Sequence, residues 1–212
     1  MSASDTAARR RDVSRSTSAS APTVADPAPL GLAAFALTTF VLSCFNAKIV
    51  GDPKLEAVVL PLALFYGGTT QLLAGMWEFR TGNTFGALAF SSYGAFWLSF
   101  AGYAKFVVPG LPPAGAHVAT GLFLLAWTIF TVYMTVAAIR VSGAVLLVLV
   151  ALSLTFLSLT LGALMQSDFF TRLGGWLGLL TAVAAWYASF AGVTNATWKR
   201  IVLPTWPAKQ PA

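Results

Sequence analysis

The chain has 212 residues, of which 57% are hydrophobic and only 9% are charged. Soluble domains carry about a quarter charged residues, so this composition excludes a water-soluble globule and indicates an all-α membrane protein. The net charge of +6 falls in tails and short loops rather than on one folded face, so nucleic acid is not an expected partner.

The first 25 residues are rich in Ser, Ala, Thr and Arg and contain almost no large apolar side chain. Such a segment cannot bury enough apolar surface to fold, so we expect residues 1–25 to form a disordered tail. No apolar signal-peptide core lies between the arginine cluster at residues 9–11 and Asp26, so the tail should stay in the cytoplasm. Residues 205–212 form a second cytoplasmic tail in this interpretation.

Between the tails, residues 26–204 form one transport domain with six apolar stretches of bilayer-spanning length. We expect six transmembrane helices over residues 30–47, 57–77, 84–104, 115–139, 143–165 and 173–197. Their connections are short, so neighbouring helices should be antiparallel. Pro61 should kink the second helix unless its neighbours satisfy the freed carbonyl.

The basic residues predict how these helices are oriented. With the N- and C-termini both cytoplasmic, 9 of the 13 Lys and Arg lie inside, namely Arg9, Arg10, Arg11, Arg15, Arg80, Arg140, Lys199, Arg200 and Lys209. The other 4 lie outside, namely Lys48, Lys54, Lys105 and Arg172. The excess of positive charge inside favours this orientation.

Small and hydroxylated residues gather on both sides of a short hinge predicted over residues 78–83. They are Gly67, Gly68, Thr69, Thr70, Gln71, Ala74 and Gly75 before it and Ser91, Ser92, Tyr93, Gly94 and Ala95 after it. In a membrane such residues either pack helices closely or line a wet path, and both roles remain open for each Ser and Thr. Gln71 has four bonding sites to satisfy, which favours a functional or polar-network role. Glu78 and Asn83 fit a helix cap, a pair with Arg140 or a transport role.

The sequence shows no nucleotide-binding loop, no metal-ligand spacing of His, Cys, Asp and Glu, and no nucleophile with a base. We therefore expect neither an enzyme nor a site for a metal or cofactor. No Lys or Arg lies near the middle of a predicted span. An anion that crosses must meet hydroxyls, amides and helix ends, or cross with a proton as a neutral acid.

Two motifs of this chain are similar to the signatures of the acetate uptake transporter family. The first comprises Asp26, Pro27, Ala28, Pro29, Leu30, Gly31 and Leu32, followed by Phe35 to Thr39. The second comprises Phe65, Tyr66, Gly67, Gly68, Gln71, Ala74, Gly75, Glu78, residues 82–86, Ser92, Tyr93, Gly94, Phe96 and Trp97. The similarity extends from Asp26 to about Pro204, and it departs from the common pattern at Asp26, where Asn is usual, and at Ala34, where Gly is usual.

The resemblance implies a homohexamer in the cell's inner membrane, with a path for acetate and other small carboxylates, succinate among them in some members, through each protomer. It leaves proton-coupled symport and channel-like permeation open. It implies a hydrophobic constriction of Phe35, Tyr93 and Leu152 along that path.

Four polar residues are expected around the constriction, namely Thr39, Gln71, Ser92 and Asn83. The alternative is a non-transporting membrane sensor or assembly subunit in which small residues serve packing alone.

Overall fold

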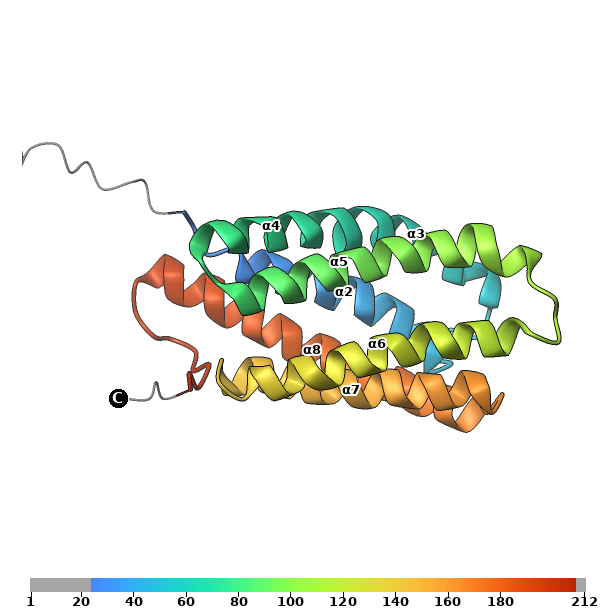
Figure 1. Ribbon diagram of the computed structural model, residues 1–212. Coiled ribbons are helices and arrows are strands. Elements are labelled where there is room, and N and C mark those ends of the chain that lie inside the picture. Colours follow the sequence, from blue (N-terminus) through green and yellow to red (C-terminus); the bar gives the residue numbers. More distant parts are fainter. Residues whose placement is uncertain (1–23, 209–212) are drawn as a thin grey trace, which may run out of the picture.

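The computed structural model describes residues 24–208, and within that range the chain is a bundle of six antiparallel helical passes (Figure 1). The predicted N-terminal tail lies almost wholly outside the described residues. The passes are α2 (Ala28–Asn46); η1 (Pro53–Val58), α3 (Val59–Pro61), η2 (Leu62–Thr70) and α4 (Gln71–Thr81); α5 (Thr84–Gly102) with η3 (Tyr103–Val107) and η4 (Val108–Gly110); α6 (Ala116–Ala138); α7 (Gly143–Leu164); and α8 (Asp168–Trp198).

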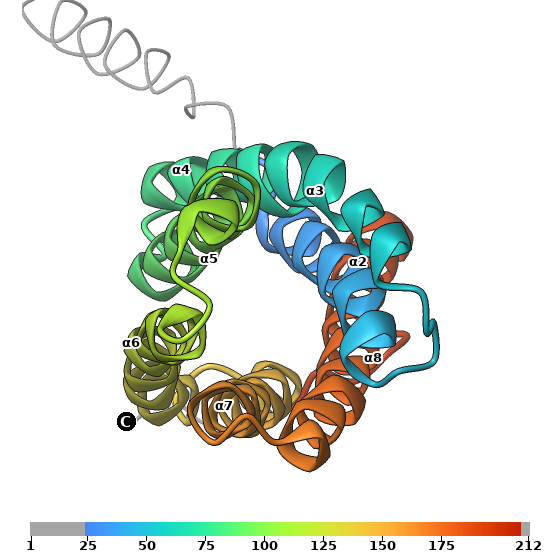
Figure 2. The same ribbon diagram turned by 90° about the vertical axis from the view of Figure 1, so that its right-hand side faces the viewer.

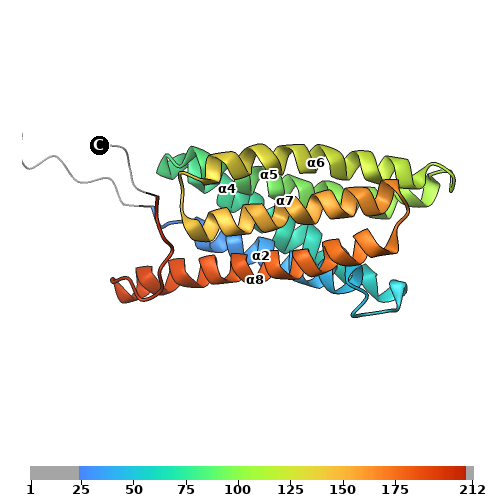
Figure 3. The ribbon, with the colours of Figure 1, turned by 90° about the horizontal axis from the view of Figure 1, so that it is seen from below.

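Seen along the bundle, α2, α8, α7, α6 and α5 follow one another around a central axis (Figure 2). The pass that contains α3 and α4 lies outside this ring and covers α2 and α5. The start of α2, the α4–α5 turn and the end of α8 lie at the same end of the bundle (Figures 1 and 3).

Five passes are long and apolar enough to cross a bilayer, by length and composition, among the residues described. The remaining pass begins with α5, which has 19 residues like α2. The serine, threonine and tyrosine residues of α5 set this pass apart from the five, although six spans were predicted.

Helix ends are set by local chemistry. The Asn83 side chain caps α5 by accepting a hydrogen bond from the backbone N–H of Gly86 at 3.1 Å, and Ser142 caps α7 in the same way. Gly82 ends α4 with a φ of +79°, a conformation that glycine adopts without strain. The hinge predicted over residues 78–83 is therefore shorter than expected, because α4 continues through Glu78 to Thr81.

The second pass widens after Pro61 instead of bending sharply at it. Residues Leu62–Thr70 form a π-helix, in which the hydroxyls of Thr69 and Thr70 donate to carbonyls five residues earlier, at 2.8 and 2.9 Å. A π-helix is a local widening of the helical ladder, and within it the two threonine hydroxyls supply additional donors to the carbonyls of Leu64 and Phe65. These two hydroxyls thus serve their own helix.

The predicted packing role of small residues is borne out where helices approach most closely. A Cβ at Gly75 on α4 would meet the backbone and hydroxyl of Ser91 on α5, and a Cβ at Gly67 would meet Thr38 on α2. A Cβ at Gly68 would meet the side chain of Leu98. Glycines at these positions allow backbone contact that any side chain would prevent.

The chain after α8 turns back across the end of the bundle. The Asn195 side chain accepts hydrogen bonds from the backbone N–H groups of Val202 and Leu203 and donates to the Leu203 carbonyl. The Gly143 N–H donates to the Trp206 carbonyl at 2.8 Å. The end of α8 is thereby fixed to the start of α7.

Candidate transport pathway

Two of the cavities formed by the described residues adjoin each other inside the bundle, one of about 270 Å³ and one of about 80 Å³. Both are large enough to hold several waters or a small solute. Phe35 on α2 and Leu152 on α7 line both cavities, so these side chains form the boundary between them. The smaller cavity lies toward the α4–α5 turn and includes Tyr93 in its wall.

The structure brings the three predicted constriction residues together at this boundary. Each is at most 4% exposed, and the Phe35 and Tyr93 rings lie 5.7 Å apart between centroids. The Tyr93 hydroxyl donates to Thr131 Oγ1 at 3.1 Å, and Phe130 meets the Tyr93 ring edge-on at 5.3 Å. Contacts on two sides therefore fix the position of the Tyr93 ring.

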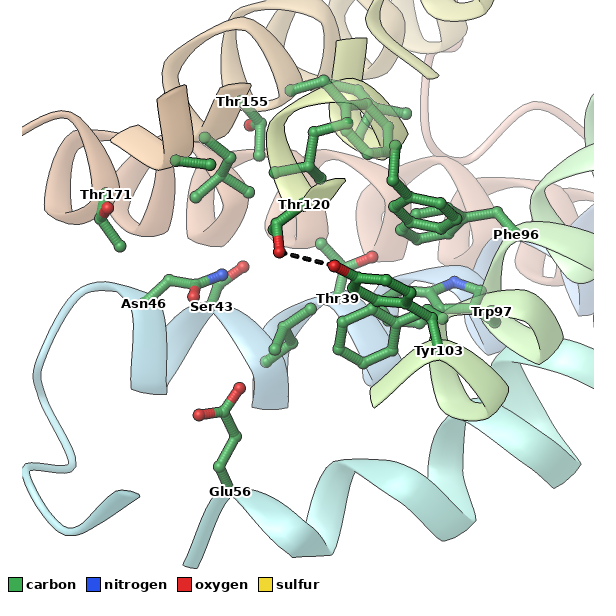
Figure 4. Close-up of a pocket in the computed structure, with 18 of the residues that line it drawn as sticks. Thr39, Ser43, Asn46, Glu56, Phe96, Trp97, Tyr103, Thr120, Thr155 and Thr171 are labelled. Carbon is green, nitrogen blue, oxygen red and sulfur yellow. Dashed lines mark hydrogen bonds between the residues drawn. The ribbon is translucent and has the colours of Figure 1, made fainter. Parts of the chain in front are cut away.

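A cluster of aromatic side chains that the sequence analysis did not single out fills the space between α5 and α6. The Phe96 ring lies within 5.9 Å of those of Phe123, Trp127 and Phe156. Farther along, Tyr103 stacks on Phe123 at 5.3 Å and its hydroxyl lies 2.7 Å from Thr120 Oγ1 (Figure 4). Aromatic residues at helical spacing are usually core residues, so no pattern in the sequence marked Phe96, Tyr103 and Phe123 as cavity-lining.

Polar groups in the larger cavity follow one face of α2. Thr39, Ser43 and Asn46 lie on successive turns and line the cavity, with Thr155 and Thr171 on the opposite wall (Figure 4). The Thr39 hydroxyl is buried and has no hydrogen-bond partner among the described residues. Its predicted role as a donor to the solute stays a prediction.

The smaller cavity is lined mostly by apolar side chains, with Gln71, Asn83 and Tyr93 as the residues that carry side-chain polar groups. Gln71 is 1% exposed, and its Oε1 atom has no partner among the described residues. The Oδ1 atom of Asn83 is occupied by the cap of α5. Both predicted polar residues thus line the cavity, although the Asn83 side chain also caps the start of α5.

Ser92 was predicted to lie around the constriction, but its side chain faces away from the cavities. It is absent from the described linings of both cavities, and it lies on the face of α5 that carries the exposed residues Leu88, Ala95 and Ser99. Successive helical residues point about 100° apart, so adjacency to Tyr93 turns Ser92 away from the cavities. The prediction that Ser92 donates to the solute is not supported by this placement.

The N-terminal motif fixes the start of α2. Asp26 accepts a hydrogen bond from the backbone N–H of Ala28 at 2.9 Å, and the Pro27 carbonyl accepts one from Gly31. The Pro29 carbonyl accepts a bond from Ser189 on α8 at 2.6 Å. The Asp26 carboxylate therefore stabilises the turn that leads into α2, by a hydrogen bond to the backbone two residues along the chain.

Charge is nearly absent from the two linings. Glu56 on η1 is the one charged side chain that lines either cavity within residues 24–208, and it points into the larger one (Figure 4). Within the same part of the chain, no three His, Cys, Asp or Glu side chains are grouped so that they could hold a metal ion. A carboxylate in either cavity would meet dipoles rather than a cation.

These observations define the chain as a polytopic helical membrane protein whose bundle encloses two cavities separated by apolar side chains. A sequence profile of the GPR1/FUN34/yaaH family matches residues 12–210, and the chain belongs to this family. The family resemblance expected from the two motifs is confirmed.

Relatives cover most of the chain. It is 43% identical over 204 residues to acetate permease A of Emericella nidulans, and this alignment covers 85% of this chain and 65% of that protein. It is 35% identical over 181 residues to the succinate-acetate/proton symporter SatP of Escherichia coli K12, covering 85% of this chain and 95% of SatP. A solved structure of the bacterial acetate channel SatP matches with a TM-score of 0.80 at 33% identity, covering 86% of this chain and 99% of that one. The chain thus spans slightly less than two thirds of the fungal relative and nearly all of SatP.

Proposed function

We propose that this protein carries acetate and similar short monocarboxylates across the cell membrane, from one internal cavity to the other past Phe35, Tyr93 and Leu152, and that it is not an enzyme. The observation that carries the proposal is that Phe35 and Leu152 line both cavities, in a family whose named members include an acetate permease and an acetate channel. Residues 26–204 are the transport domain in this proposal.

The composition of the two cavities suits a solute with a methyl group at one end and a carboxylate at the other. The methyl group passes an apolar boundary, while the carboxylate meets hydroxyls and amides on either side. Dehydrating a carboxylate costs several kcal/mol, and each hydrogen bond to a charged group returns about 1.5 to 3 kcal/mol. Two to four donors such as Thr39 and Gln71 would sustain passage without trapping the solute.

A proton would balance the charge of the solute more cheaply. Because no lysine or arginine lines either cavity within the described residues, an anion at the boundary would meet no fixed positive charge, whereas a neutral acid avoids most of the desolvation cost. We therefore propose that acetate and a proton cross together.

Six passes with both termini in the cytoplasm complete the proposed topology. Six antiparallel passes place the start of α2 and the end of α8 on one side (Figure 3), and the distribution of basic residues favours the cytoplasm for that side. The assembly proposed by family resemblance is a homohexamer with one path per protomer.

The test is labelled acetate uptake into proteoliposomes, with the pH gradient and the membrane potential clamped independently. We expect the initial protein-dependent rate, after subtraction of the leak in empty vesicles, to rise with a pH gradient at zero potential. A rate that follows only potential and the acetate gradient would indicate an anion channel. No uptake above empty vesicles would favour a non-transporting sensor or assembly subunit.

A further inference from the structure

A buried carboxyl group lies behind the smaller cavity, at the α4–α5 turn. Glu78 on α4 is 1% exposed. Its Oε2 atom accepts a hydrogen bond from the Thr81 hydroxyl at 3.1 Å, but its Oε1 atom is buried without a hydrogen-bond partner. A buried carboxyl oxygen that has no partner needs an explanation, and a bound proton or an ordered water provides one.

Among residues 24–208, the groups that act on Glu78 are the Thr81 hydroxyl, the Asn83 amide and the Asp26 carboxylate, and none of them carries a positive charge to balance an ionised carboxylate. The start of α5 faces it with the Asn83 amide and with Gly86, where a Cβ would lie 2.6 Å from both the Asn83 Nδ2 and Glu78 Oε1 atoms. The charged group that acts on it is the carboxylate of Asp26, before α2. Burial of a carboxylate without a cation is costly, and a second negative charge adds to that cost.

Asn83 links this carboxyl group to the cavity. Its side chain lies against Glu78 and also lines the smaller cavity. On the same face of α4, two turns from Glu78, Gln71 lines the cavity with a second unpartnered oxygen. A carboxylate bound near Gln71 and Asn83 would therefore lie one side chain away from Glu78.

We propose that Glu78 is the proton-binding group of this transporter, an inference that rests on the proposed transport of acetate with a proton. A carboxylate in the smaller cavity increases the fraction of Glu78 that holds a proton, which comes from the solution at the α4–α5 end, because two neighbouring negative charges are unfavourable. The proton passes to the carboxylate as it leaves the cavity, so that the solute crosses as the neutral acid and Glu78 is left ionised until it binds another proton. By linkage, the proton and the carboxylate each increase the affinity for the other by the same factor, on the order of tenfold.

A structural role for Glu78 would have different consequences. A carboxylate at the α4–α5 turn could simply fix the turn through Thr81 and the start of α5. Its loss would then lower stability and leave the ratio of protons to acetate unchanged. The charge carried per acetate separates the two roles.

The experiment compares Glu78→Gln with the wild-type protein in proteoliposomes. Glutamine keeps the size of the side chain and one oxygen that can accept from Thr81, but it cannot bind the proton. We expect wild-type uptake to be electroneutral, so its initial rate responds to the pH gradient and not to potential. The rate of Glu78→Gln should respond to potential and lose its dependence on the pH gradient. Asp168→Asn, which removes an exposed carboxylate at the start of α8, should behave as wild type.

The outcomes separate the two proposals. Electroneutral, pH-driven uptake by Glu78→Gln would overturn the role of Glu78 and leave acetate transport standing. Wild-type uptake that follows potential alone would overturn proton coupling and with it the role of Glu78. No wild-type uptake would overturn transport itself.

If Glu78→Gln does not fold, infrared difference spectra of the wild type provide the test. We expect acetate added at constant pH to increase a carboxylic-acid band, and Glu78→Asp, which keeps the acid on a shorter side chain, to shift that band. A spectrum without an acetate-dependent acid band would overturn the proposal.

Discussion

At the scale of single residues, Leu152 offers the most direct test of the boundary between the cavities. Leu152→Ala should widen the boundary and raise the uptake of larger monocarboxylates relative to acetate, because this side chain lines both cavities. Removing it should also cost about 2–5 kcal/mol of stability. The measurement is the ratio of lactate to acetate uptake in proteoliposomes, normalised to folded protein.

Leu146→Ala is the matched control for Leu152→Ala. Leu146 is another leucine of α7 that packs against the core, partly buried where Leu152 is fully buried, and it lines neither cavity. It should lower stability without changing the ratio of lactate to acetate. An equal change of the ratio in both variants would mean that loosening the bundle, rather than the boundary, sets the size limit.

The sequence predicted individual site residues unevenly, for a physical reason. Phe35, Thr39, Gln71 and Asn83 were placed on cavity walls because motifs or unusual polarity marked them. Phe96 was not placed on a cavity wall. An apolar residue in a membrane helix can face lipid, a neighbouring helix or a cavity, and the sequence looks the same in all three cases. Burial of Glu78 also went unpredicted, since it depends on how far α4 extends past the membrane-spanning stretch and on the position of α5.

At the scale of helices, Gly75 tests how closely α4 and α5 must approach. A Cβ there would overlap the backbone and hydroxyl of Ser91, so Gly75→Ala should separate the two helices and cost about 1–3 kcal/mol. Gly102→Ala is the opposite case. Gly102 has a helical φ of −63°, and no atom lies within 4 Å of the position that a Cβ would take. Alanine should therefore stabilise the protein by about 0.5–1 kcal/mol. Thermal unfolding of both variants in detergent gives the comparison, and equal shifts would contradict the close packing at Gly75.

Helix number and order were predictable, whereas local helix form and length were not. Long apolar stretches separated by short polar turns produce antiparallel passes whatever their detailed packing. The π-helix after Pro61 depends on threonine hydroxyls that can reach carbonyls five residues back. The extension of α8 to Asp168–Trp198, beyond the predicted 173–197, lies mostly at its start, where a polar first turn with Asp168 precedes the apolar stretch.

At the scale of the whole molecule, the helices around the axis are joined in two different ways. Small residues bring α2 and α8 into backbone contact at Gly175, where a Cβ would meet Ala47, and α7 also packs closely on α8. The backbones of α5 and α6 stay apart along most of their length. Aromatic side chains around Phe96 fill the space between them. The α5–α6 contact is therefore the seam that depends most on individual side chains.

Phe96→Ala should open that seam. Phe96 contacts aromatic rings on α5, α6 and α7, so its loss should cost about 3–5 kcal/mol. Because α2, α7 and α8 are held by close backbone packing, we expect hydrogen exchange to accelerate mainly in α5 and α6. Phe106→Ala, at an 80% exposed position in η3, should change stability by about 0.5 kcal/mol or less. Mass spectrometry of exchanged protein in detergent resolves the helices, and uniform acceleration in all of them would mean that the bundle opens as one cooperative unit instead of at a seam.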